Sequence, residues 1–304
     1  MKRKLIFTTL LCVTMFAPIS LFGQDFVMRG TTLWGYNGNA ADVIIPEGVT
    51  AIESLGFDNH NIITSVTIPA SVTYIGEQAF FNLRSLTSIT IPDSVTYIGN
   101  FAFSWCVALT NITIPASVAH IGNFAFTGCS SLINITVDTR NNEYSSMEGI
   151  LFNKDRTILI KYPEGKQERI YNIPSSVATV KYWAFWNCGS LASITVDIQN
   201  TAYSSVEGVL FNKDKTVLIC YPAGRQESTY TIPAGVISIN GGAFVHCLSL
   251  ASITIPSSVT SIGDYAFNND VYIVTNNLRT VTISRKTAID NNAFPAQAEI
   301  TYSD

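Results

Sequence analysis

Four cysteines recur at corresponding positions of this chain and form the residue set with the clearest potential for chemistry. Cys106 and Cys129 are 23 residues apart, and Cys188 and Cys247 are 59 residues apart. Thiols in one column could form disulfides or hold a metal ion, or they could be small buried side chains. We favour buried thiols, because side chains stacked in register point in parallel rather than toward one another. Cys220 stands apart from this column and is expected to be a free thiol.

The other residues with catalytic or metal-binding potential form no recognisable motif. His60, His120 and His246 lie outside any zinc-protease or nucleophile motif, and no glycine-rich phosphate loop follows a strand. The acidic residues are scattered, whereas a glycan-active enzyme would need paired carboxylates in one cleft. Five polar residues could be argued as calcium ligands but are better explained by two turns: Asp138, Asn141, Asn142, Asp197 and Asn200. We therefore predict no catalytic residue, no metal site and no cofactor.

The elements that would position these residues repeat every 23 residues. The pattern Ile-x-(Ile/Val)-Pro places Pro46, Pro69, Pro92 and Pro115 at equal steps. A period of this length indicates a solenoid, in which each coil buries its apolar side chains only against its neighbours. Each unit ends in Leu-x-x-Ile-x-Ile, which predicts a strand. Eleven residues after each unit's start stands a phenylalanine, which we expect to stack into a continuous spine: Phe57, Phe80, Phe103, Phe126, Phe185, Phe244 and Phe267.

Two units are longer than the rest and match one another. Residues 138–173 and 197–232 each hold 36 residues, and each contains two apolar runs on either side of Asn-Lys-Asp. In the first unit these runs cover residues 149–152 and 157–162, which predicts a β-hairpin. The two long units begin 59 residues apart, so a 59-residue segment has been duplicated.

The sequence thus predicts a mainly β repeat solenoid with a parallel sheet, two inserted hairpins and capped ends. We assign residues 1–23 to a signal peptide, 24–45 to an N-terminal capping hairpin, 46–283 to the solenoid and 284–304 to a C-terminal cap. The N-terminal hairpin is expected to turn at Asn37 and Gly38. Residues near the C-terminus are expected to form a closing strand.

The first residues of the chain predict export. Lys2, Arg3 and Lys4 precede a mostly apolar stretch over residues 5–22, as in a signal peptide. The predicted location is therefore the cell surface or the extracellular space, with the periplasm as another possibility. Residues 24–304 hold 15 basic and 22 acidic residues, which argues against nucleic acid and anionic membranes as partners. No other apolar run is long enough to insert into a bilayer.

The repeat resembles that of a known family. Residues 92–114 read PDSVTYIGNFAFSWCVALTNITI, which is similar to the units of the BspA-like leucine-rich repeat family of bacterial surface proteins. The resemblance extends over roughly residues 43–294 and implies a right-handed leucine-rich-repeat-like stack. It also implies export or surface exposure, and several members are adhesins for host matrix proteins or other microbes. The family has no shared catalytic residues.

Two surfaces are candidates for binding. The first is a column of threonines predicted to point outward from the strands, which could order water or hold a sugar, although threonine is also simply a good exposed strand residue. The second is a set of large aromatic residues at positions that vary between units: Tyr74, Tyr97, Phe101, Trp105, Phe124, Trp183 and Trp186. These aromatics could form a recognition patch, or they could stack on one another and shield one side of the solenoid.

The resulting hypothesis is a non-enzymatic exported binding protein. An adhesin that recognises a host matrix protein, a glycan or another cell surface fits the solenoid, the predicted signal peptide and the family resemblance. The alternative is a structural or scaffolding protein of the cell envelope. The sequence does not identify the ligand, because the fold of a repeat array does not fix its specificity.

Overall fold

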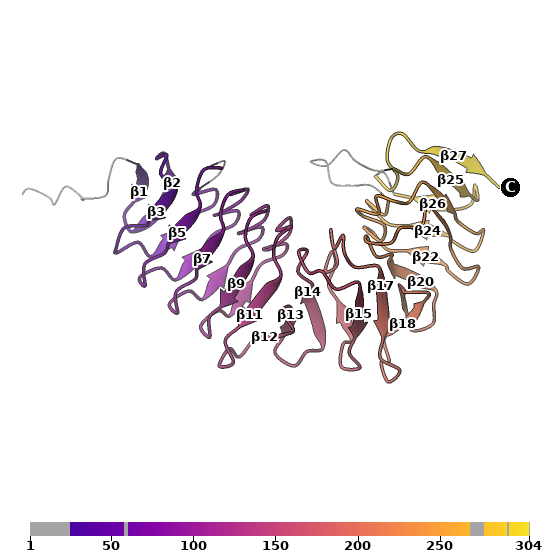
Figure 1. Ribbon diagram of the computed structural model, residues 1–304, viewed down its shortest axis with the longest axis horizontal. Helices are drawn as coiled ribbons and strands as arrows, with labels where there is room; N and C mark the ends of the chain where they lie inside the picture. The colour runs from indigo at the N-terminus through magenta and orange to yellow at the C-terminus, as the bar shows by residue number, and fades with distance from the viewer. Residues whose placement is uncertain (1–24, 58–59, 268–276, 291, 304) are drawn as a thin grey trace, which may run out of the picture.

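The computed structural model describes residues 25–57, 60–267, 277–290 and 292–303. These residues form a stack of β coils that curves into an arch (Figure 1), and no helix occurs among them. The predicted β solenoid is therefore confirmed. The predicted signal peptide, residues 1–23, lies outside the described residues.

One ladder of strands follows the predicted Leu-x-x-Ile-x-Ile segments. Its members pair in parallel within the groups β3-β5-β7, β9-β11, β15-β17 and β21-β23-β25-β27. Their bounds are β3 (Asp42–Ile44), β5 (Ser65–Thr67), β7 (Ser88–Thr90), β9 (Asn111–Ile114), β11 (Asn134–Val137), β15 (Ile170–Ile173), β17 (Ser193–Val196), β21 (Thr229–Thr231), β23 (Ser252–Thr254), β25 (Thr280–Ile283) and β27 (Glu299–Tyr302). The last of these is the predicted closing strand. Alternation puts Ile89 in the core and Thr90 in solvent, so the threonine column points outward as predicted.

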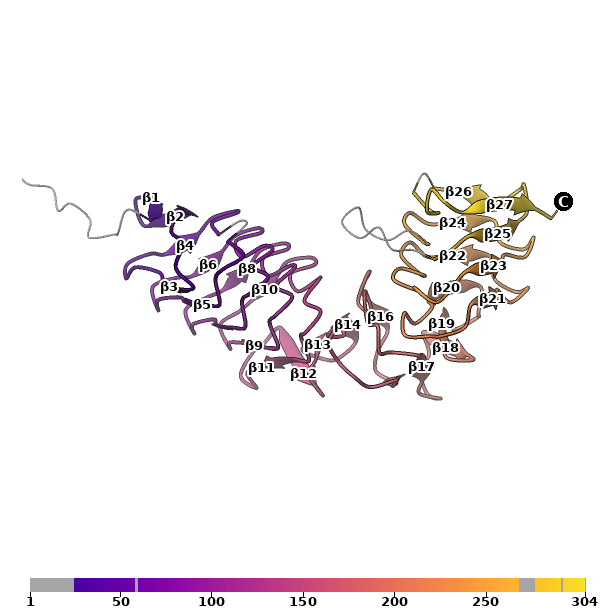
Figure 2. The same ribbon diagram turned by 45° about the horizontal axis from the view of Figure 1, so that its top comes forward.

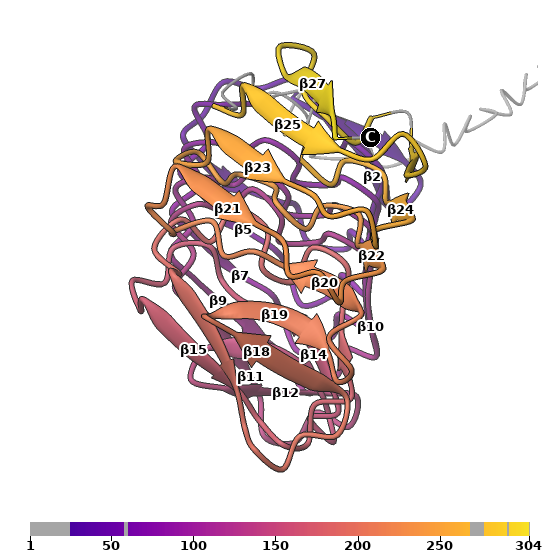
Figure 3. The same ribbon diagram turned by 90° about the vertical axis from the view of Figure 1, so that its right-hand side faces the viewer.

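A second parallel ladder consists of two-residue strands that the sequence did not reveal. These are β4 (Ala51–Ile52), β6 (Tyr74–Ile75), β8 (Tyr97–Ile98), β10 (His120–Ile121), β16 (Thr179–Val180), β22 (Ser238–Ile239), β24 (Ser261–Ile262) and β26 (Ala288–Ile289). Figure 2 shows these short strands on the inner side of the arch and the longer strands on its outer side, and Figure 3 separates the two ladders in the C-terminal half. Two residues between turns are too few to display the alternation that identifies a strand.

The predicted aromatic spine runs through the core between these ladders. Phe57, Phe80 and Phe103 stack with ring centroids 5.2 and 5.3 Å apart. The long units continue the column with tyrosine, because Tyr162 lies 5.7 Å from Phe185 and its N–H donates to Ala184, as a spine residue of a regular coil does. The column of rings therefore includes the long coils, but among the described residues it is not continuous, because no ring contact joins Phe126 to Tyr162 or Phe185 to Tyr221.

The N-terminal hairpin forms, but its predicted turn is wrong. Strands β1 (Phe26–Arg29) and β2 (Thr32–Tyr36) are antiparallel and turn at Gly30, whose φ is +62°. A positive φ is available to glycine without steric cost, which suits Gly30 to this turn. Strand β2 then pairs in parallel with β4, which attaches the hairpin to the short-strand ladder.

Each long unit contains the predicted hairpin and one strand more. Strands β13 (Ile150–Asn153) and β14 (Ile158–Lys161) form the hairpin, and β12 (Tyr144–Met147) pairs with the far edge of β13. The second copy has β18 (Tyr203–Val206), β19 (Val209–Asn212) and β20 (Val217–Cys220) in the same arrangement. The first hairpin follows β11 in the stack, since Ile135 N–H donates to the Gly149 carbonyl at 2.9 Å. The outer ladder is therefore interrupted where the arch bends (Figure 1).

A buried asparagine attaches each hairpin to the preceding coil. Asn141 Nδ2 donates to the carbonyls of Pro115 and Val118 at 2.8 and 2.9 Å, and its Oδ1 accepts two backbone N–H groups of the following turn. Asn200 makes the same four bonds in the second copy. The amide is therefore a turn residue, as predicted, and both of its ends are occupied by backbone groups.

Replacing Asn141 by aspartate tests this attachment. A carboxylate cannot donate to the two carbonyls, so we expect the free energy of unfolding to fall by about 2–6 kcal/mol, at roughly 1–3 kcal/mol for each buried acceptor left unpaired. Urea denaturation followed by circular dichroism measures this change. Asn142→Asp is the matched control, because Asn142 is exposed. Equal stability of the two variants would show that the amide does not anchor the hairpin.

Candidate functional site

The structure separates the seven predicted aromatic residues into two groups. Tyr74 on β6 and Tyr97 on β8 belong to the first, and they stack with His120 on β10. The ring centroids of Tyr74 and Tyr97 are 4.9 Å apart, and those of Tyr97 and His120 are 4.5 Å apart, with interplanar angles of 15° and 11°. These three residues, here called the tyrosine ladder, are paired in register across the short strands. Tyr74 and His120 are exposed and Tyr97 is half-buried, so the tyrosine ladder is accessible to solvent.

The second group, here called the aromatic cluster, consists of Phe101, Trp105, Phe124, Trp183 and Trp186. Phe124 lies 5.1 Å from Phe101 and 5.0 Å from Trp183 between ring centroids. Trp186 meets Trp105 edge to face at 5.8 Å and lies 6.1 Å from Trp183. Trp186 is buried, with 3% of its surface exposed, whereas the other four are partly exposed. The cluster is therefore largely a stack of mutually shielding rings, and Trp186 belongs to its core.

The cluster forms because the long units have shorter inner turns. In a regular coil, five residues lead from the short-strand isoleucine to the spine, as from Ile121 to Phe126, whereas only three lead from Leu159 to Tyr162. The shortened coil leaves a space on the inner side, here called the first gap, which lies between the coil of Phe124 and the coil of Trp183. Side chains from the two flanking coils meet across it.

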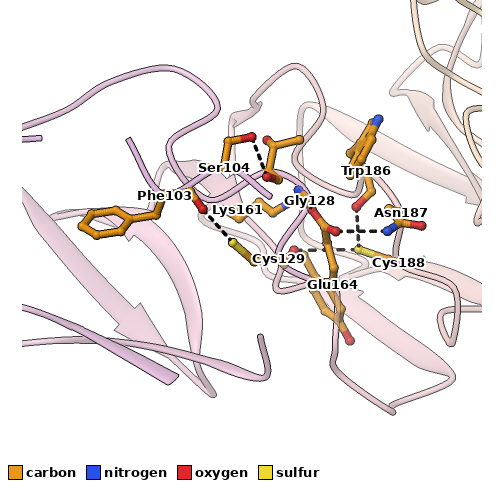
Figure 4. Close-up of polar contacts among 11 residues, drawn as sticks. Phe103, Ser104, Gly128, Cys129, Lys161, Glu164, Trp186, Asn187 and Cys188 are labelled. Carbon is orange, nitrogen blue, oxygen red and sulfur yellow. Dashed lines mark hydrogen bonds and ion pairs between the residues drawn. The ribbon is translucent and has the colours of Figure 1, made fainter. Parts of the chain in front are cut away.

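A buried ion pair occupies the base of the first gap (Figure 4). Lys161 Nζ lies 2.8 Å from Glu164 Oε1, and the side chains are 7% and 0% exposed. The same Oε1 accepts the Gly128 N–H at 2.8 Å, while Oε2 accepts Asn187 Nδ2 at 3.1 Å. Glu164 is therefore bonded on both oxygens, as a buried carboxylate must be to offset the loss of its hydration.

The carboxylate takes the place of a backbone carbonyl. In the preceding coil, the N–H of Trp105 donates to the carbonyl of Thr127 at 2.8 Å. Gly128 is the corresponding donor one coil later, but the next coil is the shortened one and offers Glu164 Oε1 instead. Sequence reasoning missed Lys161 and Glu164. The signal available was the difference between the two copies, because the second copy has Cys220 and Ala223 at the corresponding positions.

His246 packs against the other side of Trp186. The two rings meet edge to face with centroids 4.5 Å apart. Burial lowers the pKa of His246 to about 4, and the positive charge of Lys161 contributes in the same direction. The imidazole is therefore neutral at physiological pH. Its counterpart in the first copy is Asn187.

The cysteine column is buried, as predicted. Cys106 donates to the carbonyl of Phe80 at 3.2 Å, and Cys129 donates to that of Phe103 at 3.1 Å. Burial raises the pKa of Cys106 to about 12, so this thiol stays protonated. Cys188 and Cys247 are buried free thiols as well, and Cys220 is free and partly buried. Among the described residues, no group of three or more histidine, cysteine or acidic side chains is placed to hold a metal ion.

Comparisons with known proteins agree with the repeat and the fold. Residues 50–163, 164–216 and 223–303 match the family model described as BspA type Leucine rich repeat region, in six copies. The chain belongs to the BspA-type leucine-rich repeat family. No curated protein matches the sequence. In the part of the chain that the structure describes, no helix is long and apolar enough to span a membrane.

Solved structures of bacterial leucine-rich repeat proteins are similar to this BspA-type chain, and the first of them shares its fold. A leucine rich cell surface protein from Faecalibacterium prausnitzii is 25% identical with a TM-score of 0.54, and the match covers 92% of this chain and 93% of that one. The pneumococcal vaccine antigen PcpA is 20% identical with a TM-score of 0.47, covering 91% and 85% of the two chains. A leucine-rich repeat protein from Eubacterium ventriosum is 20% identical with a TM-score of 0.44, covering 89% and 71%.

The role of the ion pair can be tested by copying the second unit into the first. Glu164→Ala leaves a buried lysine unpaired, so we expect the free energy of unfolding to fall by about 3–5 kcal/mol. Lys161→Cys combined with Glu164→Ala reproduces the Cys220 and Ala223 pair, and it should recover at least half of that loss. Urea denaturation of both variants measures the difference. A double variant as unstable as the single one would contradict an electrostatic cause.

The burial of His246 predicts a pH dependence of stability. The unfolded imidazole titrates near its ordinary pKa of 6.5 and the folded one at about 4, so between these values the unfolded chain binds more protons. Stability should therefore be complete above pH 6.5 and should decrease by about 3 kcal/mol as the pH falls through 4.

His246→Asn, which copies Asn187, separates this effect from the titration of the carboxylates. The difference in free energy of unfolding between the BspA-type parent chain and the variant should change across the window from pH 6.5 to pH 4 and stay constant above it. A constant difference at all pH values would mean that the folded and unfolded imidazoles titrate alike.

Proposed function

We propose that this protein is a non-enzymatic binding protein of the bacterial surface that recognises a protein or glycan on another cell or in its matrix. Membership of the BspA-type family, whose surface repeat proteins are generally non-enzymatic, supports the proposal. The relative from Faecalibacterium prausnitzii is described as a cell surface protein. The predicted signal peptide supports export of this chain.

The observation that carries the proposal is the tyrosine ladder on the inner side of the arch. Tyr74, Tyr97 and His120 hold one another by stacking, so their rings lose little conformational freedom when a partner binds. They present polar atoms in a row with a spacing set by the backbone. Burial raises the pKa of Tyr74, and Tyr97, Glu53 and Glu77 add to this, so the hydroxyl remains a hydrogen-bond donor. Rigid amphipathic rings of this kind are common at recognition surfaces.

The aromatic cluster adds further aromatic side chains to the inner side of the arch. Tyr182, which is 48% exposed, lies against Trp183 with ring centroids 5.2 Å apart. Phe101 and Phe124 are partly exposed on the same inner turns, whereas Trp186 is buried and serves as a base for the others. A partner that binds along the inner side of the arch would contact aromatic side chains of both the tyrosine ladder and the aromatic cluster.

Replacing both tyrosines by alanine tests the proposal. The purified chain is assayed for saturable binding to a panel of host matrix proteins and glycans, beside Tyr74→Ala/Tyr97→Ala. We expect the double variant to lose at least tenfold in affinity, because rigid aromatic anchors dominate such interfaces. Its melting temperature should fall only modestly, since each of the two stacked ring contacts that are lost contributes about 0.5–1.5 kcal/mol.

Thr90→Ala/Thr113→Ala, on the outer side, is the matched control and should bind like the parent chain. A loss of binding in the threonine variant alone would move the recognition surface to the outer sheet.

Protease treatment of intact cells supplies a separate check of location. Resistance of the chain in intact cells, with digestion after lysis, would favour a role inside the envelope.

A further inference from the structure

The duplicated segment contains two gaps, and only the first is filled. The second gap lies over the shortened coil of residues 197–232, between the coil of Trp183 and the coil of Gly242. Five residues around the first gap have smaller counterparts around the second: Lys161, Glu164, Tyr182, Trp183 and Trp186 correspond to Cys220, Ala223, Gly241, Gly242 and Val245. The space left in the first gap is about 40 Å³, whereas a cavity of about 240 Å³ lies in the second.

One glycine of this cavity, Gly242, is not required by the backbone conformation. Gly242 has a φ of +67°, but Phe101, Phe124 and Trp183 adopt φ of +54°, +59° and +61° at the same position of their coils. A side chain is therefore compatible with this conformation. A Cβ on Gly242 would stand 2.6 Å from Trp183 Nε1, so the absence of a side chain gives room to the indole above it. Gly242 is therefore explained by the space that the indole needs and not by the backbone conformation.

The walls of the cavity combine flat apolar rings with hydrogen-bond donors. Trp183 and Trp186 line one side, and Ile219 and Cys220 line the base. The Nε1 atoms of Trp183 and Trp186 are buried and have no hydrogen-bond partner, and that of Trp183 lies beside Gly242. Lys181 and Asn240 stand at the exposed part of the wall, and among the residues that the structure describes no acidic side chain lines the cavity. An unpaired buried donor costs free energy that a ligand with an acceptor oxygen would recover.

We propose that this cavity binds one pyranose ring of a glycan. The space exceeds the roughly 150 Å³ of a cavity that holds benzene, so one substituted six-membered ring fits. A pyranose has a face of C–H groups that can lie against an indole ring, and its hydroxyl oxygens can accept from the unpaired indole N–H groups of Trp183 and Trp186 and from the rim donors. A phenyl side chain would fill the space but would leave the donors unpaired. The inference rests on the proposed binding function and assigns a sugar to this site.

Saturation-transfer NMR on the purified full chain tests the proposal, with methyl glucoside, methyl galactoside and methyl N-acetylglucosaminide as probes. Ile219→Trp adds a ring at the half-buried base and should reduce binding of the recognised sugar at least tenfold. Ile219→Val keeps the space open and should bind like the parent chain. Tryptophan fluorescence should change on binding in the parent chain and in Ile219→Val. Thermal melting verifies that each variant is folded. If Ile219→Trp does not fold, Cys220→Met fills the base of the cavity in its place.

Several outcomes would overturn the assignment. Equal sugar binding by the parent chain and a folded plugged variant would place the sugar elsewhere, and failure of all three sugars would remove the sugar assignment. Binding of phenylalanine amide in place of sugars, lost in Ile219→Trp, would make the cavity a pocket for an aromatic side chain. If the chain binds its macromolecular partner through Tyr74 and Tyr97 while Ile219→Trp has no effect on sugar binding, the proposed function stands and this inference fails.

Discussion

Hydrogen bonds between neighbouring coils hold equivalent residues side by side, and the other features of the molecule depend on this register. Thr96 N–H donates to the Thr73 carbonyl, and Tyr97 pairs with Tyr74 in the parallel short strands. Since equivalent positions are 23 residues apart in regular coils, any side chain repeated at that step stacks on its copy. The core spine and the exposed tyrosine ladder arise from this single constraint, one in the interior and one at the surface.

Where a coil departs from the standard length, a side chain can replace the missing backbone group, as it does in the first long unit. The first long unit has an inner turn two residues shorter, and Gly128 then meets the Glu164 carboxylate in place of a carbonyl. Burying that charge requires a second one, Lys161, and an amide donor from the following coil. A buried ion pair adds little net stability compared with apolar packing. Its role here is to satisfy a particular donor, and the second copy manages without it.

The regular part of the structure could be predicted from the sequence, because apolar columns repeated at one step report directly on burial. The two-residue strands could not be recognised, since they are too short to show a period. The burial of Trp186 was also beyond prediction, because it depends on a turn in another coil that lacks two residues. Likewise Lys161 and Glu164 appear as ordinary surface residues until the shortened turn places them beneath the cluster. Comparison of the two copies was the informative signal, since equivalent positions that differ must occupy different surroundings.

The inner turns separate stability from recognition. Spine and strand positions are constrained by contacts on both neighbouring coils, so they accept few residue types. The turn position occupied by Phe101, Phe124, Trp183 and Gly242 has a positive φ in every case, and its side chain faces the inner side of the arch. Phenylalanine, tryptophan and glycine all fit the same backbone there. A substitution at this position can therefore fill or open a gap between coils while the register is maintained, and two copies of one segment have become a packed junction and a cavity.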